Sequence, residues 1–386
     1  MIQIRSKNIL LPDRILDGSI LLDGNRIAAI LPADRACELP ALNETYDVGD
    51  SFVSAGFIDL HTHGGGGYAF ENGCEAVVRG CEFHLLHGTT SICPTVSAAP
   101  IAKMERATEG IAEAMHDPRV RGTILGAHLE GPYLSREQAG AQCADFITPP
   151  DPEGYLPLLA RHADHIVRWS YAPENDADGT FARTLCSYGI LPAAGHTAAI
   201  LDDMIHAEEN GCRLVTHLYS CTSTVTRDHG FRRLGVIESV FLSDTLFAEI
   251  ICDGKHLPPE LIRMIYKIVG ANRLALITDS LALTGTAITR GRMEATDFII
   301  EDGVCKLLDR TAFAGSIATA DRLLRVAVKE AGIPLPEAVR MLTETPARIL
   351  NLDHKGRIAV GADADLVVLD PALNVESVFA HGIRIS

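Results

Sequence analysis

The feature that most constrains the fold of this 386-residue chain is a regular alternation of two kinds of segment. Short apolar runs, typical of buried strands, alternate with longer segments in which apolar residues recur at three- and four-residue steps, which predicts helices. Strands that alternate with helices in this way pair in parallel. Eight runs are expected to be strands: 57–63, 89–96, 123–131, 166–173, 190–196, 213–219, 246–256 and 273–279.

Eight strand-helix units predict an α/β fold, a (β/α)₈ TIM-like barrel. A doubly wound open sheet is the alternative, but no Gly-x-Gly-x-x-Gly motif follows the first predicted strand. The two ends of the chain differ from the barrel pattern. Both contain short strand-like runs, and two of these runs are joined by an Asp-Gly turn. We expect residues 53–355 to form the barrel, and residues 1–52 and 356–386 to pair into a small β-sandwich domain.

The composition of the chain excludes some classes of binding partner. The net charge of −16 argues against a nucleic-acid surface, because phosphate backbones require concentrated lysine and arginine. The apolar runs are too short to span a bilayer, and the N-terminus lacks the pattern of a secretory signal. The ten cysteines are scattered without a Cys-x-x-Cys pair, which predicts reduced thiols. We expect a cytoplasmic protein with no nucleic-acid or membrane partner.

Two histidines end the first predicted strand, in the stretch AGFIDLHTHGGGG at residues 55–67. Alternate side chains of a strand share one face, so His61 and His63 would point at the same place. Such a pair can give a metal ion two nitrogen ligands. The alternative is a pair of partly buried histidines at a strand end. The four glycines allow a sharp turn that leaves space above the strand.

Further candidate ligands end other predicted strands. Glu130 lies at the end of the third run, His196 of the fifth, His217 of the sixth and Asp279 of the eighth. Functional residues of such barrels gather at the carboxyl ends of the strands, so these side chains are expected to converge on one rim. Nitrogen and carboxylate ligands suit zinc or ferrous iron, and the two oxygens of Glu130 could bridge two ions. The sequence therefore predicts a metal centre.

Seven motifs carry a resemblance to a known family: GFIDLHTHG, GAHLEGPYL, AAGHTA, VTHLYS, CDGKH, LITDS and the tail GRIAVGADADLVVLD. In this order the chain resembles the amidohydrolase superfamily. HLEGPY together with DGKH resembles its N-acetylglucosamine-6-phosphate deacetylases, over essentially the whole length. The resemblance implies a metal-dependent amide hydrolase that converts N-acetylglucosamine 6-phosphate to glucosamine 6-phosphate and acetate. It also implies one or two divalent ions, with zinc expected before iron, manganese or cobalt.

The resemblance also assigns ligands. Glu130, His196 and His217 match the metal ligands that these deacetylases share. His61 and His63 match the pair that allows a second ion.

The same comparison of motifs assigns catalytic and substrate-binding roles. Asp279 matches the catalytic acid and base at the metal, and His256 matches a histidine that contacts the substrate near its amide. Arg227 matches an arginine that binds the sugar phosphate and can reach a neighbouring subunit's pocket, which implies a homodimer. Ala314 is a further expected substrate contact.

Two segments depart from the family pattern. Asn-Ala-Met is replaced by Ser220, Cys221 and Thr222, and Gly-Ala-His is replaced by Gly140, Ala141 and Gln142. The resemblance places both segments in the substrate pocket. A substrate other than N-acetylglucosamine 6-phosphate therefore stays open, such as the galactosamine epimer or another amide. A deaminase or cyclic amidase and a non-catalytic metal-binding barrel are further alternatives.

Overall fold

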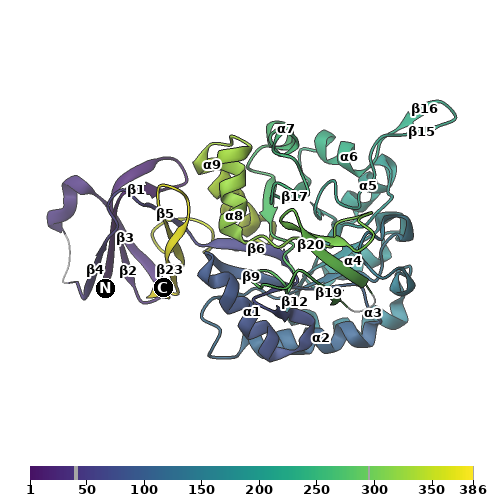
Figure 1. Cartoon of the computed structure of the whole chain (residues 1–386), viewed down its shortest axis with the longest axis horizontal. Helices are drawn as coiled ribbons and strands as arrows, with labels where there is room; N and C mark the ends of the chain where they lie inside the picture. Colours follow the sequence, from purple (N-terminus) through teal and green to yellow (C-terminus); the bar gives the residue numbers. More distant parts are fainter. Residues whose placement is uncertain (39–41, 294–295, 386) are drawn as a thin grey trace.

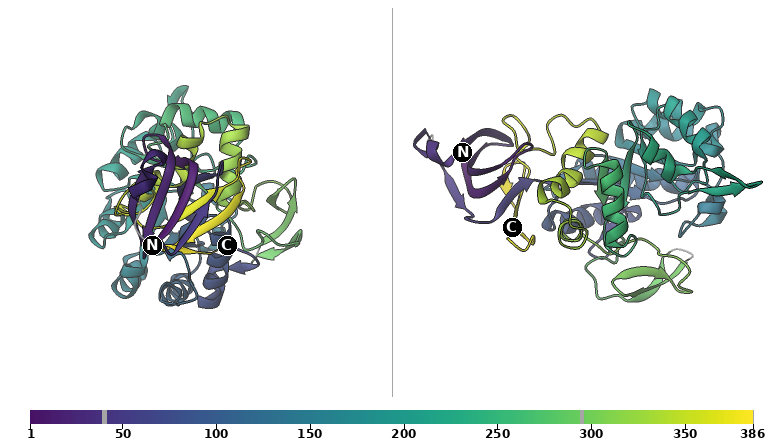
Figure 2. Two further views of the ribbon diagram at one scale, coloured as in Figure 1. Left: turned by 90° about the vertical axis from the view of Figure 1, so that its left-hand side faces the viewer. Right: turned by 90° about the horizontal axis from the view of Figure 1, so that it is seen from above.

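The computed structural model describes residues 1–38, 42–293 and 296–385 and consists of a barrel flanked by a smaller sheet (Figure 1). Both chain ends lie at the smaller sheet, far from the opposite end of the barrel (Figure 1). Seen from the side of the small sheet, the barrel helices form a ring behind it (Figure 2). The predicted barrel with a small β domain built from both ends of the chain is confirmed.

All eight predicted runs contain a barrel strand, and each strand pairs in parallel with the next. The run predicted at 123–131 is interrupted at Gly126, whose φ of +139° and close approach to Val167 leave no room for a Cβ atom. The strands are β6 (Phe57–Thr62), β9 (Thr89–Val96), β10 (Thr123–Ile124), β11 (Ala127–Glu130), β12 (Ile166–Tyr171), β13 (Leu191–Ala194), β14 (Leu214–Val215), β17 (Phe247–Ile251) and β18 (Leu274–Ile277).

Several strands end earlier than predicted at their carboxyl ends. His196, His217 and Asp279 lie just beyond strands β13, β14 and β18, each with a positive φ of 48°, 31° and 47° respectively. A left-handed backbone cannot continue a strand, so the chain turns at these residues. Non-glycine residues in this conformation cluster at functional sites, where the surrounding structure holds them.

Helices connect the strands and cover the outside of the barrel (Figure 1). Helices lie between the barrel strands, as the three- and four-residue spacing of apolar residues predicted, and three further α-helices follow β18. The α-helices are α1 (Cys74–Leu86), α2 (Ile101–Met115), α3 (Pro152–His162), α4 (Thr180–Ser187), α5 (Leu201–Glu209), α6 (Val236–Leu242), α7 (Pro259–Val269), α8 (Ala320–Arg325), α9 (Leu335–Leu342) and α10 (Glu344–Ile349). A π-helix, η7 (Val326–Glu330), continues α8, and short 3₁₀ helices occur at η1 (Ala33–Glu38), η2 (Phe70–Asn72), η3 (Arg136–Gln138), η4 (Ala144–Phe146), η5 (Ala163–His165) and η6 (Pro173–Asn175).

The barrel closes between β18 and β6 through a side-chain hydrogen bond and isolated backbone hydrogen bonds rather than a continuous backbone ladder. Thr278 Oγ1 donates to Asp59 Oδ2 at 2.5 Å, and the backbone N–H of Asp279 donates to the carbonyl of His61 at 2.9 Å. Burial raises the pKa of Asp59 to about 6, against the opposing hydrogen bonds from Thr278 and His61. The junction therefore fixes the two strands that carry His61 and Asp279.

A buried ion pair lies inside the barrel below the rim. The side chains of Arg168 and Glu249 are both fully buried, and Arg168 Nη2 donates to Glu249 Oε2 at 2.9 Å. The same guanidinium donates to Thr216 Oγ1 at 2.9 Å and to the carbonyl of Leu60 at 3.2 Å. One arginine thus links strands β6, β12 and β17 with the residue that follows β14.

The small sheet joins the two ends of the chain. Strand β22 pairs antiparallel with β5, and the order is β24-β23-β22-β5-β1-β2-β3, with β4 paired to the other part of β1. Its strands are joined by continuous hydrogen bonding, and their buried apolar side chains form a core of their own. The bounds are β1 (Ile2–Leu10), β2 (Ile15–Asp23), β3 (Arg26–Pro32), β4 (Glu44–Asp47), β5 (Phe52–Ala55), β22 (Leu366–Leu369), β23 (Val375–Ala380) and β24 (Ile383–Arg384).

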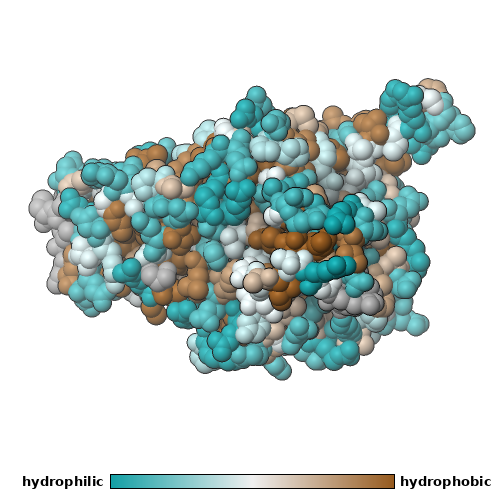
Figure 3. Space-filling model, in the orientation of Figure 1, coloured by the Kyte–Doolittle hydropathy of each residue, from teal (hydrophilic) through white to brown (hydrophobic). Residues whose placement is uncertain are grey.

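Three further sheets were not predicted from the sequence, because most of their strands have four residues or fewer. The hairpin of β15 (Thr226–Asp228) and β16 (Phe231–Arg233) projects far from the barrel (Figures 1 and 2). Strands β19 (Arg290–Met293), β20 (Thr296–Glu301) and β21 (Val304–Leu307) form a separate sheet beside the barrel, and β7 (Gly64–Gly65) pairs with β8 (Tyr68–Ala69). Apolar surface gathers near the middle of one face of the molecule, where the β20 region lies (Figure 3).

Among the described residues, no helix combines the length and the apolar composition that crossing a membrane requires.

Replacing Glu249 by Gln should lower the free energy of unfolding by about 3–5 kcal/mol, because Arg168 would stay buried without its counter-charge. Urea unfolding followed by circular dichroism measures the change. The matched control is Glu260→Gln at an exposed position of α7, which should change stability by no more than about 0.5 kcal/mol. Equal stability of the two variants would contradict a supporting role for the buried pair.

Candidate metal centre and substrate cavity

The carboxyl-terminal rim of the barrel brings all six predicted metal-facing residues together. Two groups of three each place their donor atoms within 4.8 Å of one another, and both groups contain Glu130. The first group adds His61 and His63, and the second adds His196 and His217. Asp279 faces the first group, with Oδ1 at 3.5 Å from His61 Nε2 and 3.3 Å from His63 Nε2.

The two carboxylate oxygens of Glu130 face different histidines. Oε1 lies 2.9 Å from His217 Nε2, 3.2 Å from His196 Nε2 and 3.5 Å from His61 Nε2. Oε2 lies 3.3 Å from His63 Nε2. A carboxylate arranged in this way can bridge two cations, one between each pair of histidines and the shared acid.

Hydrogen bonds on the far side of the rings fix the histidine tautomers. His196 Nδ1 donates to the carbonyl of Gln138 at 2.9 Å, and His217 Nδ1 donates to the carbonyl of Ser220 at 3.0 Å. Because a carbonyl only accepts, Nδ1 of each ring carries the proton and Nε2 is free to ligate a metal. His63 Nδ1 is held by Ser97 Oγ at 3.1 Å. Neither the two carbonyls nor the Ser97 hydroxyl could be identified from the sequence, because no local pattern marks a group that meets a ring from another part of the chain.

The electrostatics of the cluster favour bound cations. Burial opposes the ionisation of Glu130, but His61, His196 and His217 hold its pKa well below the usual range. Burial alone would lower the pKa of His63, but hydrogen bonds to Asp279 and Glu130 outweigh it and raise that pKa to about 10. Histidine nitrogens and carboxylate oxygens about 3 Å apart need protons or metal ions between them, because bare lone pairs at that distance repel. The donor set therefore fits divalent metal ions.

Asp279 stays ionised at this site. Its burial favours the neutral acid, but the neighbouring His61 and His63 lower its pKa to about 2. The backbone at Asp279 is held on both sides, because its N–H donates to the carbonyl of His61 and its own carbonyl accepts from the N–H of Ser316. A charged carboxylate beside a metal-bound water is suited to accept a proton from it.

His256 lies at the cavity and is oriented by an acid that the sequence analysis missed. Asp253 Oδ2 accepts from His256 Nδ1 at 2.8 Å, and Oδ1 accepts the backbone N–H groups of Lys255 and His256, both at 2.8 Å. This leaves Nε2 of the imidazole for another partner. The ring of Phe313 packs on the imidazole with centroids 4.9 Å apart. The Asp-x-x-His spacing within CDGKH was the available signal for Asp253.

A cavity of about 580 Å³ opens above the metal-facing residues. This volume is typical of small-molecule sites. Five of the six metal-facing residues line it, and the sixth, His61, is buried beneath them. Its lining also includes every predicted substrate contact except Arg227, namely Gly140, Ala141, Gln142, Ser220, Cys221, His256 and Ala314.

Arg227 is the one predicted site residue that the structure leaves outside the cavity. It lies exposed on strand β15 of the projecting hairpin (Figure 1). Among the described residues, the lining contains no lysine or arginine at all.

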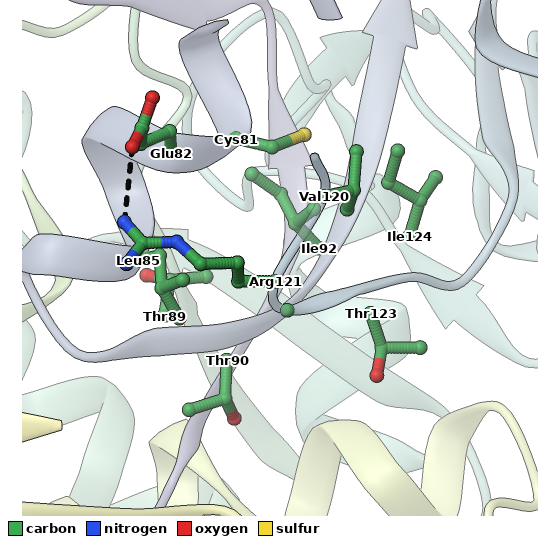
Figure 4. A pocket seen from close by; sticks show the side chains of 11 residues that line it. Cys81, Glu82, Leu85, Thr89, Thr90, Ile92, Val120, Arg121, Thr123 and Ile124 are labelled. Atoms are coloured by element: carbon green, nitrogen blue, oxygen red, sulfur yellow. Dashed lines mark hydrogen bonds and ion pairs between the residues drawn. The ribbon is translucent and has the colours of Figure 1, made fainter. Parts of the chain in front are cut away.

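A second hollow lies at the opposite end of strand β9 and is too small to be a substrate site. The ion pair between Arg121 Nη2 and Glu82 Oε1, 2.9 Å long, covers one side of it (Figure 4). The side chains inside are largely apolar, among them Leu85, Ile92 and Ile124, and the space is about 10 Å³ (Figure 4). That volume holds no more than about one water molecule.

A family model for the amidohydrolase family matches residues 52–384, and the chain belongs to this family. It is 30% identical over 378 residues to an N-acetylglucosamine-6-phosphate deacetylase of Haemophilus influenzae, covering 96% of this chain and 95% of that protein. An N-acetylgalactosamine-6-phosphate deacetylase of a Shewanella species is also 30% identical, covering 91% and 88%. The crystal structure of the N-acetylglucosamine-6-phosphate deacetylase of Pasteurella multocida superposes with a TM-score of 0.92 at 30% identity, covering 100% and 99%. The family resemblance seen in the motifs is confirmed.

Replacing Glu130 by Ala should abolish metal binding, because both groups of donors share this carboxylate. Replacing His61 by Ala should remove no more than the ion of the first group, because the second group stays intact. Metal content after dialysis, measured by inductively coupled plasma mass spectrometry, checks both expectations. His206→Ala on helix α5 is the matched control and should keep the wild-type content. Undiminished metal in Glu130→Ala would contradict the shared-ligand arrangement.

Proposed function

We propose that this protein is a metal-dependent hydrolase that removes the acetyl group from N-acetylglucosamine 6-phosphate, giving glucosamine 6-phosphate and acetate. The observation that carries the proposal is a 580 Å³ cavity with four metal-facing histidines and two carboxylates at its base. Membership of the amidohydrolase family supports hydrolysis of an amide, and relatives named for this reaction support the substrate.

The residues at the base of the cavity would have different roles in the reaction. Glu130, His196 and His217 would hold a divalent ion, with His61 and His63 available for a second. Zinc is the ion we propose first, and such an ion supplies a water of lowered pKa. Asp279 accepts the proton of the attacking water and returns it to the departing amine. His256, whose Nδ1 donates to Asp253, can donate from Nε2 to the acyl oxygen when the ring is in its imidazolium form, which stabilises the negative charge that develops there.

The phosphate group needs a cation that the cavity of one chain does not provide. Among the described residues that line it, none is lysine or arginine. Arg227 lies on a hairpin that extends away from its own barrel, and a guanidinium binds phosphate well. We therefore propose a homodimer in which each hairpin supplies Arg227 to the partner subunit. We propose a cytoplasmic location for it. Sedimentation velocity tests the assembly, and a monomer at assay concentration would contradict it.

Deacetylation of N-acetylgalactosamine 6-phosphate is the second candidate. A relative named for that reaction is as similar to this chain as those named for the glucosamine epimer. The departures from the family pattern at Ser220, Cys221 and Gln142 all line the cavity.

The first test is acetate release from N-acetylglucosamine 6-phosphate by zinc-loaded protein. The galactosamine epimer and the unphosphorylated sugar are assayed beside it. We expect phosphate-dependent turnover with the glucosamine epimer preferred. Preference for the galactosamine epimer would establish the second candidate, and no acetate from any of the three would overturn the proposed function. Ammonia release would instead indicate a deaminase.

Replacing Asp279 by Asn should leave bound metal largely in place but lower kcat by at least about 100-fold, because the amide cannot accept the proton. Acetate release and metal content are measured on the same preparation. Asp202→Asn on helix α5 is the matched control, since its side chain lies away from the cavity, and it should keep wild-type kcat. Undiminished turnover by the Asp279 variant would remove this residue from the mechanism.

A further inference from the structure

Gln142 lies in a short segment that passes over the metal-facing residues between β11 and α3. The same segment supplies the Gln138 carbonyl that holds His196 Nδ1. The backbone N–H of Gln142 donates to the carbonyl of Ala139 at 2.9 Å, which closes the turn. Gly140, with φ of +59°, lies within this turn, and a Cβ atom there would stand 2.4 Å from Cys221 Sγ. The segment is therefore packed closely against the site.

The side chain of Gln142 bridges two parts of the rim. Oε1 accepts the backbone N–H of Ala98 at 2.9 Å, and Nε2 donates to Glu130 Oε2 at 2.8 Å. Ala98 is 2% exposed and Glu130 is 1% exposed, so both partners are buried. A buried N–H and a buried carboxylate oxygen left without partners would each cost free energy.

The chemistry of the partners fixes which way the amide points. A backbone N–H only donates, so it requires the oxygen of the amide, and the amino group must then face Glu130. The reverse orientation would place two donors at Ala98 and two acceptors at Glu130. The orientation is thus set by the fold and does not depend on a bound sugar.

This contact determines how Glu130 presents its two oxygens. With Oε2 held by Gln142 and directed to His63, Oε1 is left facing His196 and His217. Rotation of the carboxylate about its last bond would break the hydrogen bond to Gln142. Groups that hydrogen-bond a ligating carboxylate fix its geometry, and losing one typically weakens metal binding roughly 10–100-fold.

We propose that Gln142 is a positioning residue for the metal-ligating carboxylate of Glu130, and that it acts on metal retention and turnover rather than on sugar affinity. The inference rests on the proposed metal-dependent function. It gives a role to one of the two places where this chain departs from the family pattern. Glutamine there supplies a neutral donor whose charge is the same at every pH.

Three substitutions separate the two hydrogen bonds. Gln142→Met has nearly the same size and removes both. Gln142→Glu keeps the acceptor for the Ala98 N–H and replaces the donor to Glu130 by a repelling oxygen, so it isolates the contact in question. Gln142→His retains a ring N–H as donor and is the rescue variant. Glu137→Met, an exposed change in the same segment, is the matched control.

The experiment measures zinc affinity by competition with a chromogenic chelator, without substrate present, and then kcat and KM for the zinc-saturated proteins. We expect Gln142→Met and Gln142→Glu to bind zinc roughly 10–100-fold more weakly, with lower kcat and nearly unchanged KM. Gln142→His and Glu137→Met should stay close to wild type in zinc affinity. Circular dichroism verifies that each variant is folded.

Wild-type zinc affinity in Gln142→Glu, with a raised KM, would overturn the inference and make Gln142 a sugar contact instead. Because zinc affinity is measured without substrate, the two proposals fail separately. A wild-type protein that releases no acetate would overturn the proposed function, while zinc loss in the Gln142 variants would still establish the positioning role.

Discussion

The burial of one carboxylate among four imidazoles is the interaction on which the rest of this site depends. Glu130 is 1% exposed, and an ionised acid at that depth is stable only when cations surround it. Histidines at the ends of β6, β13 and β14 converge on it, and carbonyls or a hydroxyl hold the far nitrogens of three of the rings. The arrangement leaves Nε2 lone pairs directed at a negative charge, which a divalent ion satisfies better than protons alone. The positive φ angles at His196, His217 and Asp279 follow from the need to aim these side chains inward at the rim.

Beneath this cluster the barrel interior is polar where a larger apolar layer would be usual. Arg168, Glu249 and Thr216 are linked by hydrogen bonds, and Ser170 connects them to His128, whose ring packs 4.5 Å from that of His61. Each of these groups contacts a specific partner, so a continuous set of hydrogen bonds and ring contacts lies under the metal-facing residues. Above the rim the chain has little regular structure, and residues 138–142 contact two of the ligands directly. The metal-facing residues therefore lie between a hydrogen-bonded polar layer below and a closely packed segment above.

Much of this could be predicted from the sequence because it depends on local pattern. The alternation of apolar runs and amphipathic segments predicted all eight barrel strands, and the Asp-Gly turn predicted the hairpin of β2 and β3. Strand ends were less accurate: the run predicted at 246–256 ends as a strand at Ile251, because Asp253 turns the chain by accepting two backbone N–H groups. The projecting hairpin that carries Arg227 was missed, since its strands are three residues long and polar. The boundaries of the two domains and the roles of the site residues remain predictions.

The sequence by itself determined which residue types end the strands, and parallel pairing in a barrel then placed them on one rim. It therefore predicted that His61, His63, Glu130, His196 and His217 lie close together, because the residue at the end of each apolar run can be read from the chain alone. Only the tertiary structure decided that Gln142 holds Glu130, that Asp253 orients His256, and that Arg227 lies outside the cavity of its own chain. The physical reason is that a hydrogen bond between side chains or loops needs two groups to meet at about 3 Å. No periodicity in the sequence encodes such a meeting.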